Sequence, residues 1–155
     1  MHEVVRAGSG QRWLLEGAHN PSGMETSCRA LQRDERWKNP WALLFGSTPQ
    51  SEMGAMLEPL VNLCRRHPPV AIVLTEPQFG RYPGVPCTEL ASALGQHDLQ
   101  ISASFANPQE AVAWVEAQSS TLTDVLCIGS LYLAGNVLQA LGADDDEALS
   151  IVAKD

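Results

Sequence analysis

Short apolar runs alternate with amphipathic stretches along almost the whole chain, and this alternation limits the fold more than any other feature of the sequence. The runs Trp41–Gly46, Val70–Thr75 and Asp124–Ile128 have the length and apolar content of buried strands. Between the runs, apolar residues recur at the three- and four-residue spacing of a helix. Because strands that are joined by helical crossovers lie parallel, the pattern predicts an α/β domain.

The expected elements give a hairpin strand followed by five strand–helix units. We expect strands at Glu3–Arg6, Arg12–Glu16, Trp41–Gly46, Val70–Thr75, Leu99–Ser102 and Asp124–Ile128. We expect helices over Pro21–Arg33, Met53–Cys64 and Thr88–Gln96, and two more that are capped by Asn107 and Ser130. Pro59 should kink or split the second helix. The prediction is a Rossmann-like, mostly parallel six-stranded sheet with its first strand antiparallel and helices on both faces.

The domain organisation and the partners follow from length, charge and cysteine usage. Residues 1–142 are expected to form a single domain, and residues 143–155 an acidic, mobile tail. The formal net charge of −8 disfavours a nucleic-acid partner, and no apolar run is long enough for a membrane span. The N-terminus lacks the pattern of a signal peptide. The four cysteines are scattered without metal-ligand spacing, so we expect a reduced, cytoplasmic protein with idle thiols and no metal site.

Two strand-to-helix turns carry the polar residues that could form a site. In sheets of this kind ligands bind at the carboxyl ends of the strands. The turn Glu16–Pro21 places His19 beside a helix N-terminus that Asn20 caps. Ser130 caps the helix after the last expected strand, with Tyr132 in its first turn. His19 and Ser130 should therefore lie at one edge of the sheet. The same residues are also compatible with ordinary capped turns and a solvated histidine.

Several common active-site motifs are absent from the sequence. It has no P-loop and no G-x-G-x-x-G after its first parallel strand, which disfavours a self-sufficient ATPase and an ordinary dinucleotide-binding domain. It has no G-x-S-x-G elbow, which disfavours a serine hydrolase. Its only lysines are Lys38 and Lys154, so the chain alone should not cradle a triphosphate.

Two segments resemble a known family. The segment Leu14–Pro21 (L-L-E-G-A-H-N-P) resembles the D-G-A-H-N-P signature of the folylpolyglutamate synthase/dihydrofolate synthase family, part of the Mur ligase superfamily. The segment Gly129–Val137 resembles the second signature of that family, G-S-L-Y-x-x-G-E-V. The likeness extends from about Glu3 to Leu141. Members of the family are two-domain ligases, and this chain resembles their C-terminal domain alone.

The resemblance implies a reaction and a set of site residues. The reaction is ATP- and Mg²⁺-dependent coupling of L-glutamate to a folate or to dihydropteroate, with ATP and Mg²⁺ bound mainly by an N-terminal P-loop domain. It implies that Glu16, in place of the signature aspartate, and Asn20 contact the nucleotide. It implies that His19 acts at the catalytic cleft and that Ser130 and Tyr132 line the glutamate side.

Two other functions remain open from the sequence. The chain could be a stand-alone Rossmann-like module that binds an anionic metabolite or a partner protein. It could also be the C-terminal domain of another Mur-type amide ligase that acts on cell-wall precursors, although the G-S-L-Y stretch favours the folate branch. If the chain is the C-terminal domain of a folate–glutamate ligase, as the resemblance implies, we expect the domain alone to be inactive.

Overall fold

The apolar runs form strands whose successive side chains enter two different cores. The computed structural model describes residues 2–34, 37, 40–142 and 149–153. The strands are β1 (His2–Arg6), β2 (Arg12–Leu15), β3 (Trp41–Phe45), β4 (Ala71–Thr75), β5 (Ala103–Phe105), β6 (Asp124–Ile128) and β7 (Leu149–Ala153). The helices are α1 (Pro21–Arg33), α2 (Met53–Arg66), α3 (Cys87–Gly95), α4 (Pro108–Glu116) and α5 (Leu131–Ala140). Strands β3, β4 and β6 are buried over their whole length, as parallel strands with both faces covered should be.

The strands form one sheet in the order β5-β4-β3-β6-β2-β1-β7. The pairs β2–β6, β6–β3, β3–β4 and β4–β5 are parallel, and β1 is antiparallel to β2. The predicted α/β class and the antiparallel first strand are therefore confirmed. The structure adds a strand that we did not expect, because β7 pairs antiparallel with the outer side of β1. This strand falls within the expected tail; residues 143–148 and 154–155 of that tail lie outside the described residues.

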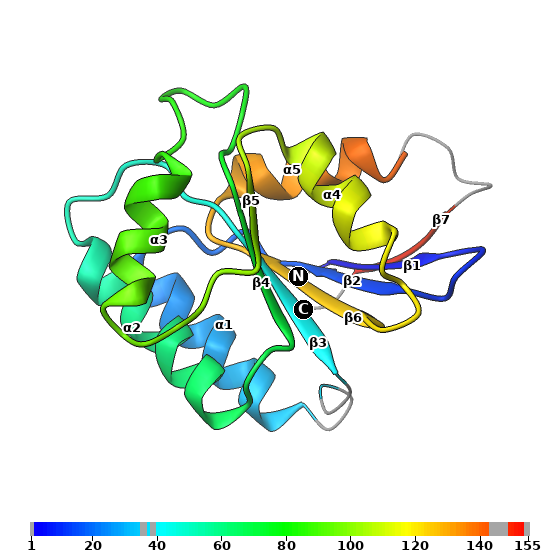
Figure 1. The fold of residues 1–155 in the computed structure, drawn as a ribbon, viewed down its shortest axis with the longest axis horizontal. Coiled ribbons are helices and arrows are strands. Elements are labelled where there is room, and N and C mark those ends of the chain that lie inside the picture. Colours follow the sequence, from blue (N-terminus) through cyan, green and yellow to red (C-terminus); the bar gives the residue numbers. More distant parts are fainter. Residues whose placement is uncertain (1, 35–36, 38–39, 143–148, 154–155) are drawn as a thin grey trace.

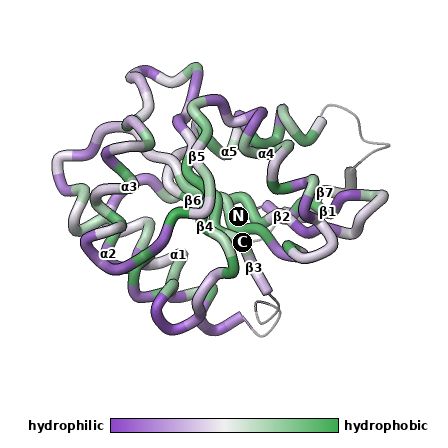
Figure 2. Tube along the Cα trace, in the orientation of Figure 1, coloured by the Kyte–Doolittle hydropathy of each residue, from purple (hydrophilic) through white to green (hydrophobic). Residues whose placement is uncertain are grey.

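The helices cover both faces of the sheet. Figure 1 shows α1, α2 and α3 on one side of the strands and α4 and α5 on the other. Alternation within β3 explains this division, because Leu43 and Phe45 pack in the core under α1–α3, whereas Ala42 and Leu44 pack in the core under α4 and α5. In Figure 2 the central strands are mostly hydrophobic, and hydrophilic segments gather on the outer helices and loops.

The structure differs from the sequence-based expectation at one strand and in part at one helix. The fifth strand was expected at Leu99–Ser102, but it lies at Ala103–Phe105, because the Ile72 N–H of β4 bonds a side chain instead of a backbone carbonyl. The Ser102 hydroxyl oxygen accepts the Ile72 N–H at 3.0 Å, the Ser102 N–H donates to the Ile72 carbonyl oxygen at 2.8 Å, and strand pairing begins at Ala103, opposite Val73. Helix α2 also continues unbroken through Pro59 instead of splitting there. Its buried face, which includes Met56, Leu60 and Leu63, offsets the backbone hydrogen bond that proline removes.

Polar side chains hydrogen-bond to one another and to the backbone where β2 and β6 begin, which is the end of these strands away from the expected site. The Arg12 side chain donates to Asp124 at 2.8 Å and to Glu3 at 3.2 Å. The buried Gln11 amide donates to the carbonyl oxygens of Val115 and Leu122. No helix within the described ranges is both long and apolar enough to cross a membrane.

Candidate functional site

The turn after β2 holds His19 at the start of α1. The Asn20 side-chain oxygen accepts the Gly23 N–H at 2.8 Å, and Pro21 occupies the first helical turn, so the predicted cap is confirmed. His19 is exposed, and its Nδ1 lies 2.9 Å from the Gly17 carbonyl oxygen. Because a carbonyl can only accept, Nδ1 carries the hydrogen in this contact, which leaves Nε2 for another partner.

The turn after β6 buries Ser130 and exposes Tyr132. The Ser130 oxygen accepts the N–H groups of Tyr132 at 3.1 Å and Leu133 at 3.3 Å, as expected for a helix cap. Ser130 is only 1% exposed, whereas Tyr132 is 44% exposed. The serine therefore fixes the first turn of α5, and the tyrosine is the side chain that reaches the surface.

The two turns lie side by side. Strands β2 and β6 are parallel neighbours, with Leu15 opposite Cys127. The Glu16 N–H continues this pairing by donating to the Cys127 carbonyl oxygen at 2.8 Å. A Cβ atom placed on Gly17 would lie 3.0 Å from Leu131 Cδ1, so the chain passes directly over the start of α5. The prediction that His19 and Ser130 share one edge of the sheet is confirmed.

Close backbone packing shapes this edge. Gly129, between β6 and α5, has φ = 120°, a conformation that side-chain-bearing residues rarely adopt. A Cβ atom there would overlap the Gly46 carbonyl oxygen and lie 2.7 Å from the Phe45 ring. Glycine at this position therefore allows the loops after β3 and β6 to touch, which sets where α5 begins.

The proline-rich loop after β4 lies at the same edge of the sheet as the two turns. A Cβ atom on Gly80 would lie 2.8 Å from Tyr132 Cδ2, so the tyrosine ring packs on the loop backbone. The side-chain oxygen of Asn136 accepts the Gln78 N–H at 2.9 Å, and its amide nitrogen donates to the Gln78 carbonyl at 3.0 Å. Sequence reasoning missed this role of Asn136. The available signal was that Asn136 stands where the second family signature has glutamate.

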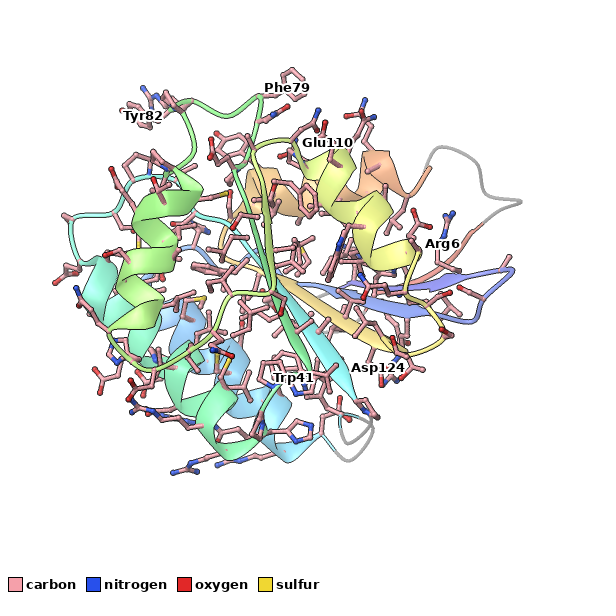
Figure 3. The ribbon with its side chains drawn as sticks, in the orientation of Figure 1. Arg6, Trp41, Phe79, Tyr82, Glu110 and Asp124 are labelled. Carbon is pink, nitrogen blue, oxygen red and sulfur yellow. The ribbon has the colours of Figure 1, made fainter. Side chains whose placement is uncertain are left out.

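Exposed apolar side chains gather at the same edge. Phe79 and Tyr82 project from the loop after β4 (Figure 3), and Leu131 and Tyr132 are exposed in the first turn of α5. The guanidinium carbon of Arg81 lies 6.0 Å from the centre of the Tyr82 ring. Large exposed apolar side chains at a loop-lined edge are compatible with a ligand- or protein-binding region.

The cysteine thiols are buried and are not activated as nucleophiles. Burial raises the pKa of the Cys28 and Cys64 thiols to about 12 and that of Cys87 to about 11, so these thiols are poor nucleophiles at neutral pH. Burial also raises the pKa of Cys127. All four cysteines are buried and free, as expected. Within the described residues, no group of three His, Cys, Asp or Glu side chains could hold a metal ion.

Comparisons with known proteins establish the fold. No family model matches the chain, and no curated protein matches it in sequence. Folylpolyglutamate synthase from Thermotoga maritima superposes with a TM-score of 0.68 at 22% identity, over 92% of this chain and 30% of that chain. Escherichia coli FolC, solved with DHPP and ADP, gives a TM-score of 0.64 at 20% identity, over 86% of this chain and 29% of that chain.

A third structure is a single domain. It is described as a domain from a UDP-N-acetylmuramate:L-alanyl-γ-D-glutamyl-diaminopimelate ligase from Haemophilus ducreyi. It gives a TM-score of 0.53 at 14% identity and covers 90% of this chain and 94% of that chain. The fold is that of the Mur ligase C-terminal domain. The chain spans less than a third of the length of the two synthases that it matches.

Proposed function

We propose that this chain is the C-terminal domain of an ATP-dependent folate–glutamate ligase and that it closes over a P-loop domain of the same enzyme. The observation that carries the proposal is the placement of the two signature segments. They follow neighbouring parallel strands, β2 and β6, and touch where Gly17 passes Leu131. Ligands of open α/β sheets bind at such carboxyl edges. The folylpolyglutamate synthase fold of the chain supports the same function.

We assign a role to each site residue from the side-chain atoms that make no hydrogen bond within the domain. When both ring nitrogens carry a hydrogen, His19 can donate from Nε2 to an anionic group of the acyl phosphate or of glutamate, while Nδ1 donates to the Gly17 carbonyl oxygen. Asn20 uses its side-chain oxygen as a cap, so only its amide nitrogen is left for the nucleotide beside Glu16. On the glutamate side, Ser130 positions the first turn of α5, and Tyr132 makes the contact with substrate.

The described residues are suited to assist the binding of ATP and Mg²⁺ and not to form the main binding site. The edge contributes His19, Arg81 and two half-buried carboxylates, Glu16 and Glu76, the second of which accepts the Cys87 N–H, and among the residues placed there none is a lysine. A triphosphate and its metal need several positive or oxygen-bearing groups in one place. The nucleotide would therefore be held mainly by the P-loop domain, and catalysis would depend on positioning and charge stabilisation in the closed cleft.

A second candidate is a Mur-type ligase that acts on cell-wall precursors, which the Haemophilus ducreyi domain supports through its fold. The decisive experiment begins with the gene. We expect the reading frame upstream of residue 1 to encode a P-loop. The polypeptide that includes it should consume ATP only when glutamate and either dihydropteroate or a reduced folate are both present. Turnover with a UDP-N-acetylmuramate peptide instead would support the second candidate. A natural start at Met1 would favour a stand-alone binding module.

A further inference from the structure

An apolar groove lies beside α3, between the loop after β3 and the proline-rich loop after β4. Its volume is about 600 Å³, which is within the usual range of binding pockets. Most of the residues that line it are apolar, among them Pro49, Met53, Pro83, Val85, Pro86 and Leu90. The lining also includes one charged residue, Glu89, and none of the five residues that we assign to the ligase site. We call this feature the α3 groove.

The walls of the α3 groove are held in place by the backbone. The Val85 N–H donates to the Ser47 carbonyl oxygen at 2.8 Å, which joins the loop after β4 to the loop after β3. The Glu76 carboxylate accepts the Cys87 N–H at 3.0 Å and fixes the start of α3. Three of the wall residues are prolines, whose φ angle is restricted. The groove is therefore formed before anything binds, and binding orders little additional structure.

The α3 groove is suited to an aromatic side chain that has a positive charge beside it. Its floor is apolar, because Val85 and Leu90 are only 7% and 1% exposed. Exposed proline rings form the rim, and proline rings pack well against aromatic rings, as in the recognition of proline-rich segments. Glu89 is exposed at the same rim, and Glu52, which is also exposed, directly precedes Met53. A cation is therefore favoured near this rim.

The same face of the molecule carries a side chain of this kind. Tyr82 is 60% exposed, and the guanidinium carbon of Arg81 lies 6.0 Å from the centre of its ring. In Figure 3 Tyr82 projects from the tip of the loop after β4 on the side of α3, away from Phe79. Tyr82 does not line the groove, but it directly precedes Pro83, which does. A protruding aromatic ring with its cation and a groove that fits such a group therefore lie side by side.

We propose that a second copy of this chain occupies the α3 groove, with its Tyr82 as the anchoring side chain. A two-fold axis would place each Tyr82 ring against the prolines of the other copy and each Arg81 near Glu89 of the partner subunit. Such an interface must be self-complementary, and a protrusion and a groove that adjoin on one face meet this requirement. Aromatic side chains that fill a pocket are typical anchors of protein interfaces. The inference does not depend on the proposed ligase function, because the groove includes none of its site residues.

Sedimentation equilibrium of the 155-residue protein tests the proposal. The contact is small, and two chains of net charge −8 repel each other, so we expect a reversible dimer with a Kd on the order of 100 µM. Tyr82→Ala should weaken the dimer roughly 30-fold or more, because each dimer loses two anchors. Phe79→Ala is the matched control. It removes an exposed aromatic ring of the same loop that does not line the groove, and the Kd should stay unchanged.

A charge exchange tests the pairing of Arg81 with Glu89. Arg81→Glu and Glu89→Arg should each weaken the dimer roughly 3- to 30-fold, because two exposed pairs per dimer become repulsive. The double variant has opposite charges again at each pair, and it should recover most of the affinity.

The proposal is wrong if the protein stays monomeric up to about 1 mM, since association weaker than this is not specific. In that case, a shift of the Met53 methyl signal in nuclear magnetic resonance on addition of a lysine–phenylalanine–lysine tripeptide would assign the groove to a different protein. Equal Kd values for Tyr82→Ala and Phe79→Ala would place the contact on another face and contradict the proposal. Failure of the double variant to recover affinity would contradict it as well.

Discussion

The side chain of Asn136 holds the backbone of Gln78 by both its N–H, at 2.9 Å, and its carbonyl oxygen, at 3.0 Å. The contact joins α5 to the loop after β4, two segments that are 58 residues apart in the chain. It places Phe79 next to the start of α4 and Gly80 against the Tyr132 ring, so one asparagine positions the loop that borders the candidate ligase site.

Asn136→Ala should lower the free energy of unfolding by about 1–3 kcal/mol, because it leaves two backbone groups without partners. Asn136→Glu should lose less, since a carboxylate can still accept the Gln78 N–H but cannot donate to the Gln78 carbonyl. Urea unfolding measures both effects. Asn62→Ala, an exposed asparagine of α2, serves as the control and should change stability little. Equal stability of Asn136→Ala and Asn62→Ala would contradict a stabilising role for the two hydrogen bonds between Asn136 and Gln78.

Gly129→Ala should prevent stable folding or lower the melting temperature strongly. Its methyl group would overlap the Gly46 carbonyl oxygen in a conformation that alanine rarely adopts. Gly135→Ala in α5 is the matched control, because nothing lies within 4 Å of its added Cβ atom. That change should raise stability by about 0.5–1 kcal/mol through helix propensity. Thermal unfolding shows whether Gly129→Ala lowers the melting temperature and whether Gly135→Ala raises it.

The buried thiols should make the protein less stable in alkali. Burial raises the pKa of Cys28 and Cys64 from 9.0 to about 12, so above pH 9 these thiols ionise in the unfolded chain but stay protonated in the folded one. The unfolded state then binds fewer protons, and the free energy of unfolding falls as the pH rises from about 9 toward 12. Each thiol contributes a slope of about 1.4 kcal/mol per pH unit in that range. Urea unfolding at several pH values should show a shallower slope for Cys64→Ala than for the unaltered protein; identical slopes would contradict this expectation.

The 155-residue protein alone should neither hydrolyse ATP nor bind it tightly. Its only lysines, Lys38 and Lys154, lie outside the described residues, and the described part holds no cluster of three or more His, Cys, Asp or Glu side chains that could hold a metal ion. Calorimetric titration with Mg-ATP should therefore give no micromolar binding. Micromolar affinity would show that the chain carries a nucleotide site of its own.

His19→Ala should reduce the turnover of the complete ligase without destabilising it. A charge-assisted hydrogen bond from His19 in the closed cleft is worth about 1.5–3 kcal/mol, which corresponds to roughly 10- to 100-fold in kcat/KM. Because His19 is exposed, its removal should change stability by no more than about 0.5 kcal/mol. Asn20→Ala should show the stability effect instead, with a loss of about 0.5–2 kcal/mol from the missing cap. Steady-state rates beside melting temperatures distinguish the two; full activity of His19→Ala would argue for a solvated histidine.

Most of the fold could be predicted from the sequence because its signals are local. Asn20 and Pro21 fix the start of α1, and continuous apolar runs mark the buried strands. The strand β5 was misplaced because its register depends on Ser102, whose hydroxyl takes an N–H of the neighbouring strand. The continuity of α2 through Pro59 depends on burial against the sheet, which outweighs a local penalty.

Less of the candidate site than of the fold could be predicted from the sequence. The turns that hold His19 and Ser130 could be placed at one edge, because strand-end loops of a parallel sheet share that edge. The contacts of Asn136 with Gln78 and of Tyr132 with Gly80 could not be predicted. They join segments that are about fifty residues apart, and no spacing rule connects them.

The place of β6 in the sheet also determines the order in which the protein can fold. Strands β2 and β3 follow each other in the chain but do not pair; each hydrogen-bonds to β6, which lies between them. During synthesis the two early strands must therefore wait until residues 124–128 have left the ribosome. Until then each of them has one unpaired edge, so this strand order predicts slower folding than pairing between consecutive strands would give.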